Sequence, residues 1–362
     1  MSFSSIKDQD VAVRLLGNVL KNGRIPNAFL FWGPGGVGKH MTAVELAKAV
    51  NCTSGPADAC NECLPCRKVA HGNHPDVKHV SPSGSSREIR KQDADEINEL
   101  AALCPFESNW RIFIIQDAER MNLTAQNHFL KTLEEPPGRS LFILMSEYPR
   151  MLLPTIRSRC QMVRFRGLRP DTVAAILQRE RDLPADLARS IAEIAEGQMS
   201  RAFGLVDTEK RDVLLAITQG LADGADPVRQ ADEFWAFLQD QQKRTEQMVA
   251  AELGMDEEGA ATREDLLRLK DERVARLNAL VKRDILEYLY LMETWYRDEM
   301  VYSATNDRER VWNRDQAGRF AARTSSDPVA KIRAIEQARV YLDRNIPGDR
   351  VFRDLFFSLA AP

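Results

Sequence analysis

The residues of this chain that most plainly carry chemistry form a glycine-rich loop, Gly33-Pro-Gly-Gly-Val-Gly-Lys39. The loop directly follows an apolar run at residues 28–32 and precedes a stretch with helical spacing, which is the context a phosphate loop requires. Glycines let backbone N–H groups turn toward phosphates, the helix N-terminus adds positive dipole, and the lysine adds a point charge. The alternative, a chance glycine-rich turn, leaves this coincidence unexplained. We therefore predict that ATP or ADP phosphates bind at Gly33, Gly36, Gly38 and Lys39.

Two positions that such a site uses for catalysis are altered. The residue after the lysine, normally a serine or threonine that ligates Mg²⁺, is His40, and neutral imidazole is a poor ligand for a cation that prefers oxygen. A second motif, an apolar strand ending in aspartate, is present at Ile112 to Asp117, but Ala118 stands where a glutamate would polarise the attacking water. Glu119, one residue later, would point elsewhere. The loop can hold nucleotide, but Mg²⁺ binding is doubtful, and we predict absent or very weak hydrolysis.

Four cysteines, Cys52, Cys60, Cys63 and Cys66, are clustered with the short spacing of a metal site. Four thiolates satisfy tetrahedral Zn²⁺ and leave no open coordination position, so we predict a structural zinc ion and not a catalytic one. The alternative is a metal-free set of buried or redox-active cysteines. Cys104 and Cys160 are isolated and are expected to be small core residues.

The elements that position these residues alternate between short apolar strands and amphipathic helices. This alternation predicts an α/β fold with a parallel five-stranded sheet and helices on both faces. The predicted strands are residues 28–32, 77–80, 112–115, 141–145 and 162–165.

The character of the chain changes after this predicted domain at residues 1–167, which includes the cysteine insertion at 52–66. Helical spacing, broken by Pro184 and ended near Gly197, predicts a small helical domain at 168–208. Residues 209–362 show almost no strand pattern and predict an all-α domain. Within it, the densely charged segment 239–282 predicts a projecting helical hairpin, broken around 254–259, with a solvated surface or a contact surface.

Composition excludes several functional classes. The 362 residues are 44% hydrophobic and 28% charged with a net charge of -3, which is ordinary globular material without the basic excess of a nucleic-acid-binding surface. No secretory leader and no membrane-spanning run is expected, so the sequence predicts a cytoplasmic protein without membrane contact.

Two further blocks carry a family resemblance: Asn127-His-Phe-Leu-Lys-Thr-Leu-Glu-Glu-Pro-Pro137 and Thr155-Ile-Arg-Ser-Arg-Cys160. Together with the loop they resemble the bacterial DNA polymerase III clamp-loader subunits of the AAA+ class, the delta-prime type most closely, with gamma/tau as its sibling. The resemblance is strong to about residue 206 and weak beyond. It implies a lid at 168–208, a collar at 209–362 and a zinc knuckle at the four cysteines.

The resemblance also implies roles and partners. It implies a hetero-pentamer with gamma/tau and delta subunits, which loads a sliding clamp onto primer-template DNA. Arg159 matches the arginine finger that reaches a neighbouring subunit's nucleotide site, where a guanidinium stabilises the transferring phosphoryl group. The alternatives are a surface salt bridge at Arg159 and a finger role for Arg157. Ser146 matches the sensor position, although Glu147 after it departs from the gamma/tau pattern, and Arg201 matches the lid arginine; both could instead be structural polar residues.

Three functions remain open on this basis. The first is a delta-prime (stator) subunit that lends Arg159 to a neighbour and is not an independent enzyme, which the changes at His40 and Ala118 favour. The second is a catalytically active gamma/tau-type ATPase with an unusual metal arrangement. The third is a AAA+ adaptor outside replication, against which the block ending at Pro137 stands.

Overall fold

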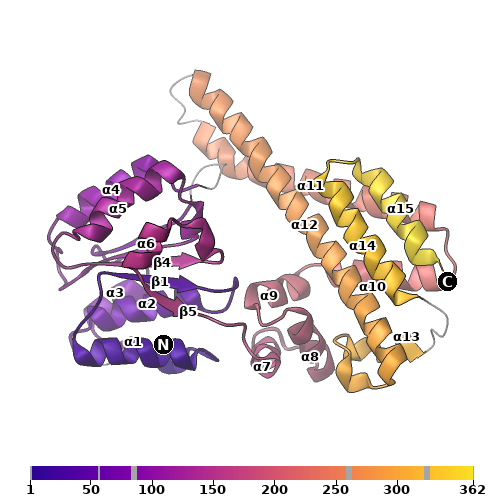
Figure 1. The fold of residues 1–362 in the computed structure, drawn as a ribbon, viewed down its shortest axis with the longest axis horizontal. Helices are drawn as coiled ribbons and strands as arrows, with labels where there is room; N and C mark the ends of the chain where they lie inside the picture. Colours follow the sequence, from indigo (N-terminus) through magenta and orange to yellow (C-terminus); the bar gives the residue numbers. More distant parts are fainter. Residues whose placement is uncertain (1, 56–57, 83–87, 258–262, 322–326, 362) are drawn as a thin grey trace. The chain divides into compact units, whose positions relative to one another are not determined.

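The chain forms two compact units, each described here by itself. The computed structural model describes residues 2–55, 58–82, 88–257, 263–321 and 327–361. One unit, called here the α/β unit, comprises residues 1–172 and 197–200. The other, the helical unit, comprises residues 173–196 and 201–362. Figure 1 shows the strands confined to the first unit, in indigo to magenta.

The α/β unit is built on a five-stranded parallel sheet in the order β2-β3-β4-β1-β5. The strands are β1 (Ala28–Trp32), β2 (Val77–Val80), β3 (Arg111–Ile115), β4 (Ser140–Ser146) and β5 (Gln161–Arg164). They lie within one residue of the predicted ranges, and the predicted fold class is confirmed. In this order β1, which leads into the glycine-rich loop, lies between β4 and β5, so three strand ends meet beside the loop.

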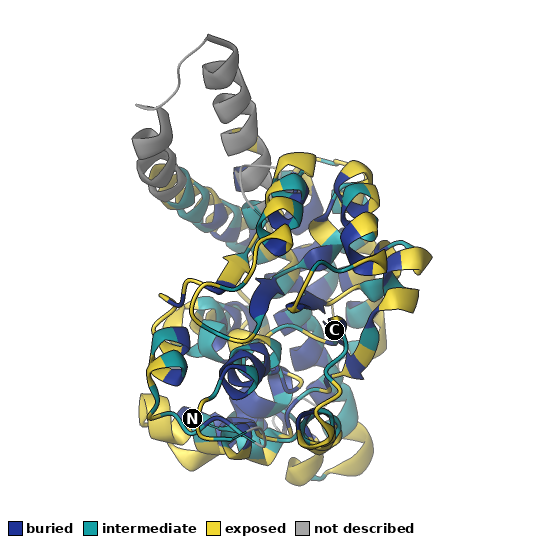
Figure 2. Ribbon diagram, turned by 90° about the vertical axis from the view of Figure 1, so that its left-hand side faces the viewer, coloured by how far each residue is buried: buried dark blue, intermediate teal, exposed yellow. Residues whose placement is uncertain are grey.

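Apolar residues alternate between the two faces of the sheet because successive side chains of a strand point in opposite directions. Phe29 and Phe31 of β1 pack in one core with the first three helices, and Ala28 and Leu30 pack in the other core with the next three. The first set is α1 (Asp10–Asn22), α2 (Lys39–Val50) and α3 (Leu64–Ala70); the second is α4 (Lys91–Ala102), α5 (Leu123–Glu134) and α6 (Pro154–Arg159). Figure 1 shows these sets on opposite sides of the sheet, and Figure 2 shows buried residues, in dark blue, within the sheet.

A buried carboxylate fixes the entry to β2. Asp76 is fully buried and accepts the backbone N–H groups of Phe106, Glu107 and Ser108 at 2.6, 2.9 and 3.0 Å. Arg111 Nη2 donates to the same carboxylate at 3.3 Å. Burial acts to raise the pKa of Asp76, but these donors outweigh it and hold the pKa below its usual value. The loop before β3 is therefore anchored by one charged group.

The helical unit is a bundle of amphipathic helices around an aromatic core. Phe234 packs edge-on against Tyr288 and Phe352, with ring centroids 5.3 and 5.1 Å apart. Trp295 and Tyr296 are 0% and 1% exposed, which is core packing and not a stacking surface. The helices are α7 (Pro170–Arg181), whose first three residues belong to the α/β unit, α8 (Ala185–Ile194), α9 (Met199–Asp207), whose first two residues belong to the α/β unit, α10 (Lys210–Ala222), α11 (Pro227–Glu257), α12 (Arg263–Thr305), α13 (Ala317–Ala321), α14 (Pro328–Asp343) and α15 (Gly348–Ala360).

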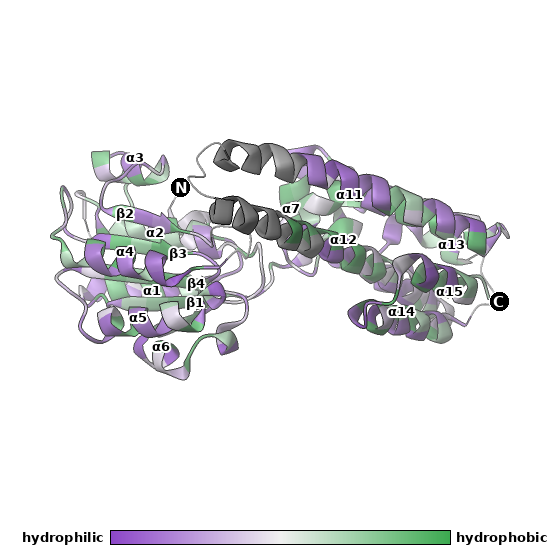
Figure 3. Ribbon diagram, turned by 90° about the horizontal axis from the view of Figure 1, so that it is seen from above, coloured by the Kyte–Doolittle hydropathy of each residue, from purple (hydrophilic) through white to green (hydrophobic). Residues whose placement is uncertain are grey.

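The predicted hairpin at 239–282 lies on the two long helices α11 and α12, which pack against each other. Figure 3 shows hydrophilic and hydrophobic residues interspersed along both. The break expected around 254–259 falls partly in α11, which continues through Glu257, and partly on residues 258–259, which lie outside the described part of the chain. Of the helices that the structure describes, none is both long enough and apolar enough to cross a membrane.

A buried ion pair connects α10 to the turn before α13. Arg211 Nη2 donates to both carboxylate oxygens of Asp315, at 2.7 and 2.8 Å, and Arg211 is only 6% exposed. Burial acts to raise the pKa of Asp315, yet the attraction of Arg211 and its hydrogen bonds hold that pKa below its usual value. The segments predicted as a separate lid and collar thus include helices that share one compact unit, and the boundary at 208 remains a prediction.

Candidate functional site

The glycine-rich loop connects β1 to α2 and takes backbone conformations that glycine adopts most easily. Gly33, Gly36 and Gly38 have φ values of +147°, +66° and +95°. A Cβ atom at Gly33 would lie 2.2 Å from the carbonyl oxygen of Phe165, so the loop also needs the missing side chain for space. Met199 N–H donates to Gly36 O at 3.2 Å. The loop is therefore held by the β5 end and by residues 197–200 of the same unit.

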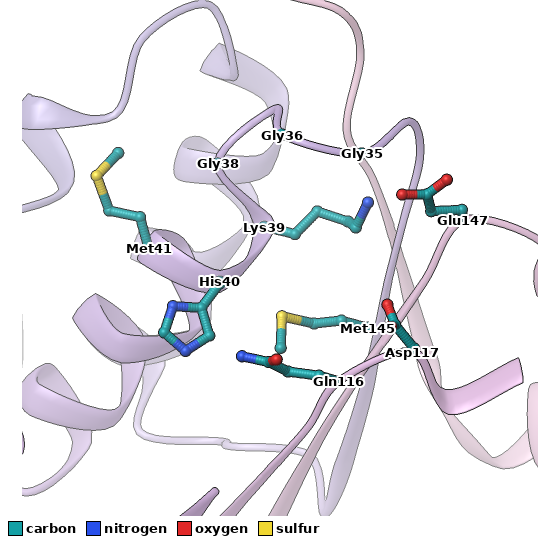
Figure 4. A pocket seen from close by; sticks show the side chains of 10 residues that line it. All are labelled: Gly35, Gly36, Gly38, Lys39, His40, Met41, Gln116, Asp117, Met145 and Glu147. Atoms are coloured by element: carbon teal, nitrogen blue, oxygen red, sulfur yellow. The ribbon is translucent and has the colours of Figure 1, made fainter. Parts of the chain in front are cut away.

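The loop borders a cavity of about 280 Å³. Its lining, shown in Figure 4, comprises Gly35, Gly36, Gly38, Lys39, His40, Met41, Gln116, Asp117, Met145 and Glu147. Lys39 Nζ donates to the loop carbonyls of Gly33 and Pro34, both at 2.6 Å. Burial lowers the pKa of Lys39 in spite of the carboxylates of Glu147, Glu119 and Asp117, which act to raise it. Of the predicted phosphate-binding residues, Gly36, Gly38 and Lys39 thus share the pocket with acidic side chains, whereas Gly33 does not line it.

The position of the magnesium ligand is taken by an imidazole. The ring of His40 lies 5.6 Å from the ring of His79, centroid to centroid. Burial, and then the nearby His79, lower the pKa of His40, so the ring is neutral at neutral pH. Thr42, the nearest hydroxyl along the chain, is fully buried and donates to Gly38 O at 2.9 Å within α2. This part of the pocket offers nitrogen where Mg²⁺ would need oxygen.

Of the two carboxylates in and just after the second motif, Asp117 lines the pocket, whereas Glu119 binds a backbone N–H group. Asp117 follows β3 in a left-handed conformation, with φ 45°, and lines the cavity. Ala118 is fully buried. Glu119 Oε1 accepts the backbone N–H of Glu147 at 2.9 Å, so this carboxylate is committed to a loop and does not replace the missing glutamate.

Two positions predicted to sense or cover nucleotide differ in their surroundings. Ser146 ends β4 and is 1% exposed, and its hydroxyl has no hydrogen-bond partner among the described residues. Arg201 belongs to the helical unit, where its guanidinium lies 4.4 Å from the Tyr290 ring centroid and 3.4 Å from the Glu196 carboxylate. Neither environment tests the predicted roles, so Ser146 as the sensor and Arg201 as the lid arginine remain predictions.

The predicted finger, Arg159, is the last residue of α6. Its Nη2 lies 2.6 Å from Glu134 Oε1, and its Nη1 donates to Thr155 O at 3.1 Å. The side chains of Arg159 and Glu134 are 35% and 50% exposed. Arg157, the alternative finger, has a buried Nε without a partner among the described residues. Arg159 is therefore oriented by a carboxylate while its guanidinium remains accessible.

The four clustered cysteines converge on one point. Their sulfur atoms all lie within 4.8 Å of one another, and those of Cys52 and Cys63 are 4.0 Å apart. Four thiolates bound to Zn²⁺ at about 2.3 Å would be about 3.8 Å apart, so the arrangement fits a tetrahedral metal ion. In the metal-free thiols, hydrogen bonds led by that from Ser54 lower the pKa of Cys60 to about 6, and burial raises that of Cys66 to about 12. A bound divalent cation would deprotonate all four. The cluster can hold a metal ion.

The other two cysteines differ from each other. Burial raises the pKa of the Cys160 thiol to about 12, as expected of a core residue. Cys104 is exposed, so its prediction as a core residue was wrong. It lies just beyond the C-terminal end of α4, where the chain turns into the loop that Asp76 anchors.

The structure adds pocket residues that the motifs did not identify. Met41, Gln116 and Met145 line the cavity beside the predicted groups. Their only sequence signal is proximity to the motifs, since each lies within two residues of a predicted position. Glu147 was visible as a departure from the family pattern, but its entry into the pocket was not.

Fold and site together define an α/β domain with a phosphate-binding type of loop between β1 and α2, followed by a helical region. Comparison with known proteins narrows this class. A family model described as "DNA polymerase III, delta subunit" matches residues 8–169. The chain is 37% identical over 186 residues to the DNA polymerase III subunit delta′ of Bacillus subtilis, a match that covers 51% of this chain and 56% of that protein. The predicted resemblance is confirmed: residues 8–169 match this family model, and delta′ subunits of DNA polymerase III are among the most similar relatives.

Related subunits also match. The DNA polymerase III subunit gamma/tau of Mycobacterium tuberculosis is 36% identical over 179 residues, which is 49% of this chain and 31% of that protein. The delta′ subunit of Pseudomonas aeruginosa is 33% identical over 46% of this chain and 51% of its own length. This chain thus spans about half the length of the delta′ relatives it matches.

Solved structures give looser matches. A DNA polymerase III gamma subunit-related protein from Thermotoga maritima aligns over 96% of this chain and 98% of its own, with 15% identity and a TM-score of 0.40. The RuvB Holliday junction branch migration motor of the same organism covers 58% of this chain and 64% of its own, with 16% identity and a TM-score of 0.38. The fold assignment stands on the strand order and the loop described above.

Proposed function

We propose that this protein is a delta-prime-type (stator) subunit of a DNA polymerase III clamp loader. In this role it assists ATP-driven loading of the sliding clamp onto primed DNA and lends Arg159 to the nucleotide site of a neighbouring subunit. Its partners are gamma/tau and delta subunits in a hetero-pentamer, with the clamp and the primer-template DNA contacted through the complex. The observation that carries the proposal is the combination of an accessible Arg159 with a pocket whose magnesium position holds His40.

The local chemistry at Arg159 suits a group that acts in trans. A guanidinium placed against a transferring γ-phosphoryl group stabilises its charge and contributes about 10³–10⁵ in rate. The contact with Glu134 orients the side chain at the end of a short helix. Because this ion pair is exposed, it is weak, and a triphosphate with its higher charge can displace the carboxylate.

The chain's own pocket supports the non-catalytic half of the proposal. Phosphoryl transfer needs Mg²⁺ in fixed geometry and a positioned water. Here a neutral His40 replaces the hydroxyl ligand, Ala118 replaces the water-polarising carboxylate, and Glu119 binds a backbone N–H instead. ATP or ADP can enter only a pocket that is poorly equipped to cleave it.

The remaining elements receive structural roles. The metal at Cys52, Cys60, Cys63 and Cys66 is proposed to be zinc, which ties the segment after α2 to α3. The helices after residue 208 are proposed to form the collar through which the ring assembles, with Arg201 as the lid arginine and Ser146 as the sensor. The hairpin of α11 and α12 receives no function.

A second candidate is a catalytically active gamma/tau-type ATPase. The specific observation in its favour is that Lys39 and Asp117 are both present and both line the cavity. It requires an unusual metal arrangement around His40. Under it, Lys39→Ala would abolish clamp loading, whereas the stator role predicts that loading survives.

The test is affinity capture of the tagged full chain from cells, with stoichiometric partners identified by mass spectrometry. We expect DNA polymerase III gamma/tau and delta subunits in fixed proportion. The purified chain alone should show negligible ATP hydrolysis. Robust magnesium-dependent turnover by the isolated chain would refute the stator role, and capture without polymerase III subunits would favour a AAA+ adaptor outside replication.

A further inference from the structure

We propose that the Glu147 carboxylate acts as an internal competitor for phosphate at the glycine-rich loop. It would weaken nucleotide binding by this chain through charge, independently of the missing magnesium ligand. The inference rests on the proposal that the loop is a degenerate nucleotide site. It concerns a residue that neither the loop motif nor the second motif contains.

The structure places both the backbone and the side chain of Glu147. Its backbone N–H donates to Glu119 Oε1 at 2.9 Å, at the point where the chain leaves β4. Its side chain points toward the loop, where Figure 4 shows the carboxylate beside Gly35 and near the end of Lys39. A Cβ atom built at Gly35 would lie 2.4 Å from Glu147 Oε1. The absent side chain of Gly35 therefore leaves room for the carboxylate against the backbone.

That space is the one a phosphate would use. A phosphate loop binds anions because its backbone N–H groups and its lysine face the same concave surface. Glu147 brings a carboxylate, itself an anion with two acceptor oxygens, to this surface. Because Glu147 and Lys39 line the same cavity, a phosphate bound at Lys39 would lie close to a carboxylate of like charge.

The charges around the pocket disfavour the binding of a phosphate. The carboxylates of Glu147, Glu119 and Asp117 act to raise the pKa of Lys39. Burial raises the pKa of Glu147 against the opposing effect of Lys39, and the neighbouring Glu119 and Asp117 raise it further, while Arg120 acts to lower it. These carboxylates already repel one another. A triphosphate would add charge of the same sign.

A purely structural role for Glu147 makes a different prediction. If the carboxylate only held Lys39 and the loop in place, its removal would lower stability and would weaken or leave unchanged the binding of nucleotide. If it competes with phosphate, its removal must strengthen binding. The sign of the change in affinity separates the two roles.

The experiment compares the full chain with Glu147→Gln, which keeps the shape and removes the charge. Binding of ATP and ADP is measured by titration calorimetry, with excess EDTA and again with Mg²⁺. Glu99→Gln, an exposed glutamate on α4 away from the pocket, is the matched control. A third variant combines Glu147→Gln with Lys39→Ala. Thermal unfolding of each variant verifies that it is folded.

We expect Glu147→Gln to bind both nucleotides about fivefold tighter or more, because like charges about 4 Å apart repel by about 1 kcal/mol even in water. Glu99→Gln should bind as the unmodified chain does, and the gain should vanish when Lys39 is also replaced. Hydrolysis should stay negligible, since His40 and Ala118 are unchanged.

Unchanged or weaker binding by Glu147→Gln would overturn the inference, as would an equal gain in Glu99→Gln. Failure to detect binding in any variant would also overturn it, because the carboxylate would then not be what limits affinity. These outcomes are read on the isolated chain, so they are distinguishable from failure of the proposed function, which is read on its partners.

Discussion

Replacement of Cys63 by serine is expected to release a bound zinc ion and to loosen the segment after α2 without unfolding the sheet. Cys63 supplies one of the four converging sulfur atoms and precedes α3 as its N-terminal cap residue. Loss of one thiolate leaves an incomplete ligand set for a metal that is held in closed, four-coordinate structural sites. The effect should be local because the sheet has its own apolar core.

The size of the effect follows from what else holds α3. Closing the cluster around zinc requires shifts of about 1 Å or less, since the sulfur atoms already lie within 4.8 Å. A structural zinc site contributes on the order of 10 kcal/mol of binding free energy. Without it, a seven-residue helix is too short to persist alone. The burial of Val69, worth about 1.5–3 kcal/mol, then provides most of the remaining stabilisation.

This difference can be read by hydrogen exchange. The amides of Arg67 and His71 are bonded to the carbonyls of Cys63 and Arg67, both at 3.1 Å. In Cys63→Ser their protection should fall to roughly 10- to 100-fold, the factor that corresponds to the residual burial energy. Metal content should fall from one zinc per chain to much less. Cys104→Ser, which removes an exposed cysteine outside the cluster, should change neither quantity.

Three results would refute this reasoning. The unmodified chain could contain no stoichiometric zinc, or Cys63→Ser could retain it. Exchange in Cys63→Ser could also rise equally in the strands of the sheet, which would show that the cluster and the sheet unfold together.

The remaining predictions concern buried charges and the loop. Asp76→Ala should lower the free energy of unfolding of the α/β unit by about 3–5 kcal/mol, because it leaves the buried Arg111 guanidinium without its counter-charge and three N–H groups without their acceptor; urea titration measures this, and a loss under about 1 kcal/mol would contradict it. The pKa of Asp315 is held below its usual value, so its contribution is present above that usual value and is lost as the pH falls through the native pKa. Thermal unfolding of the helical unit between about pH 6 and pH 3 should therefore depend less on pH in Asp315→Asn than in the unmodified chain, and identical profiles would count against it. Gly36→Ala should destabilise the loop by about 1–3 kcal/mol, since φ is +66° and the new Cβ would lie 2.6 Å from Ser200 N, and an unchanged melting temperature would count against this.

The sequence was sufficient to predict the sheet, because its three central strands, β1, β3 and β4, are buried on both faces. Runs such as residues 112–115 are apolar throughout and are bounded by polar segments, a pattern that fixes a buried parallel strand with little help from the rest of the chain. The one-residue differences at strand ends, as at Arg111 and Ser140, reflect the pairing of β3 with β4 at their first residues, which hydropathy does not report.

The clustering of the four cysteines could also be predicted from the sequence, since short spacing alone brings four sulfur atoms within reach of one ion. The exposure of Cys104 could not be predicted from the spacing of the cysteines. It depends on the loop that Asp76 anchors, and those hydrogen bonds join residues about 30 positions apart.

The directions in which side chains point are the main feature that could not be predicted from the sequence. Nothing in the pattern around Glu147 indicates that its carboxylate turns toward Gly35, or that Glu119 is drawn away to bind a backbone N–H. The contact of Arg159 with Glu134 joins two blocks that the sequence identified separately. Such pairings depend on how α5, α6 and the strands pack, and this packing was predictable only as a fold class.

The central claim is that Arg159 acts in the neighbouring subunit's nucleotide site. The most direct test is ATP hydrolysis by a reconstituted clamp loader, with clamp and primed DNA, carrying Arg159→Ala. Arg157→Ala tests the alternative finger, and Arg150→Ala is an exposed control from the same region. Because the contact of Arg159 with Glu134 is exposed, stability should change by less than about 1 kcal/mol.

The account predicts that turnover at the site next to this subunit falls by about 10³-fold or more in Arg159→Ala, with assembly intact. It predicts full activity in Arg150→Ala. Unchanged hydrolysis in an assembled Arg159→Ala loader would contradict it.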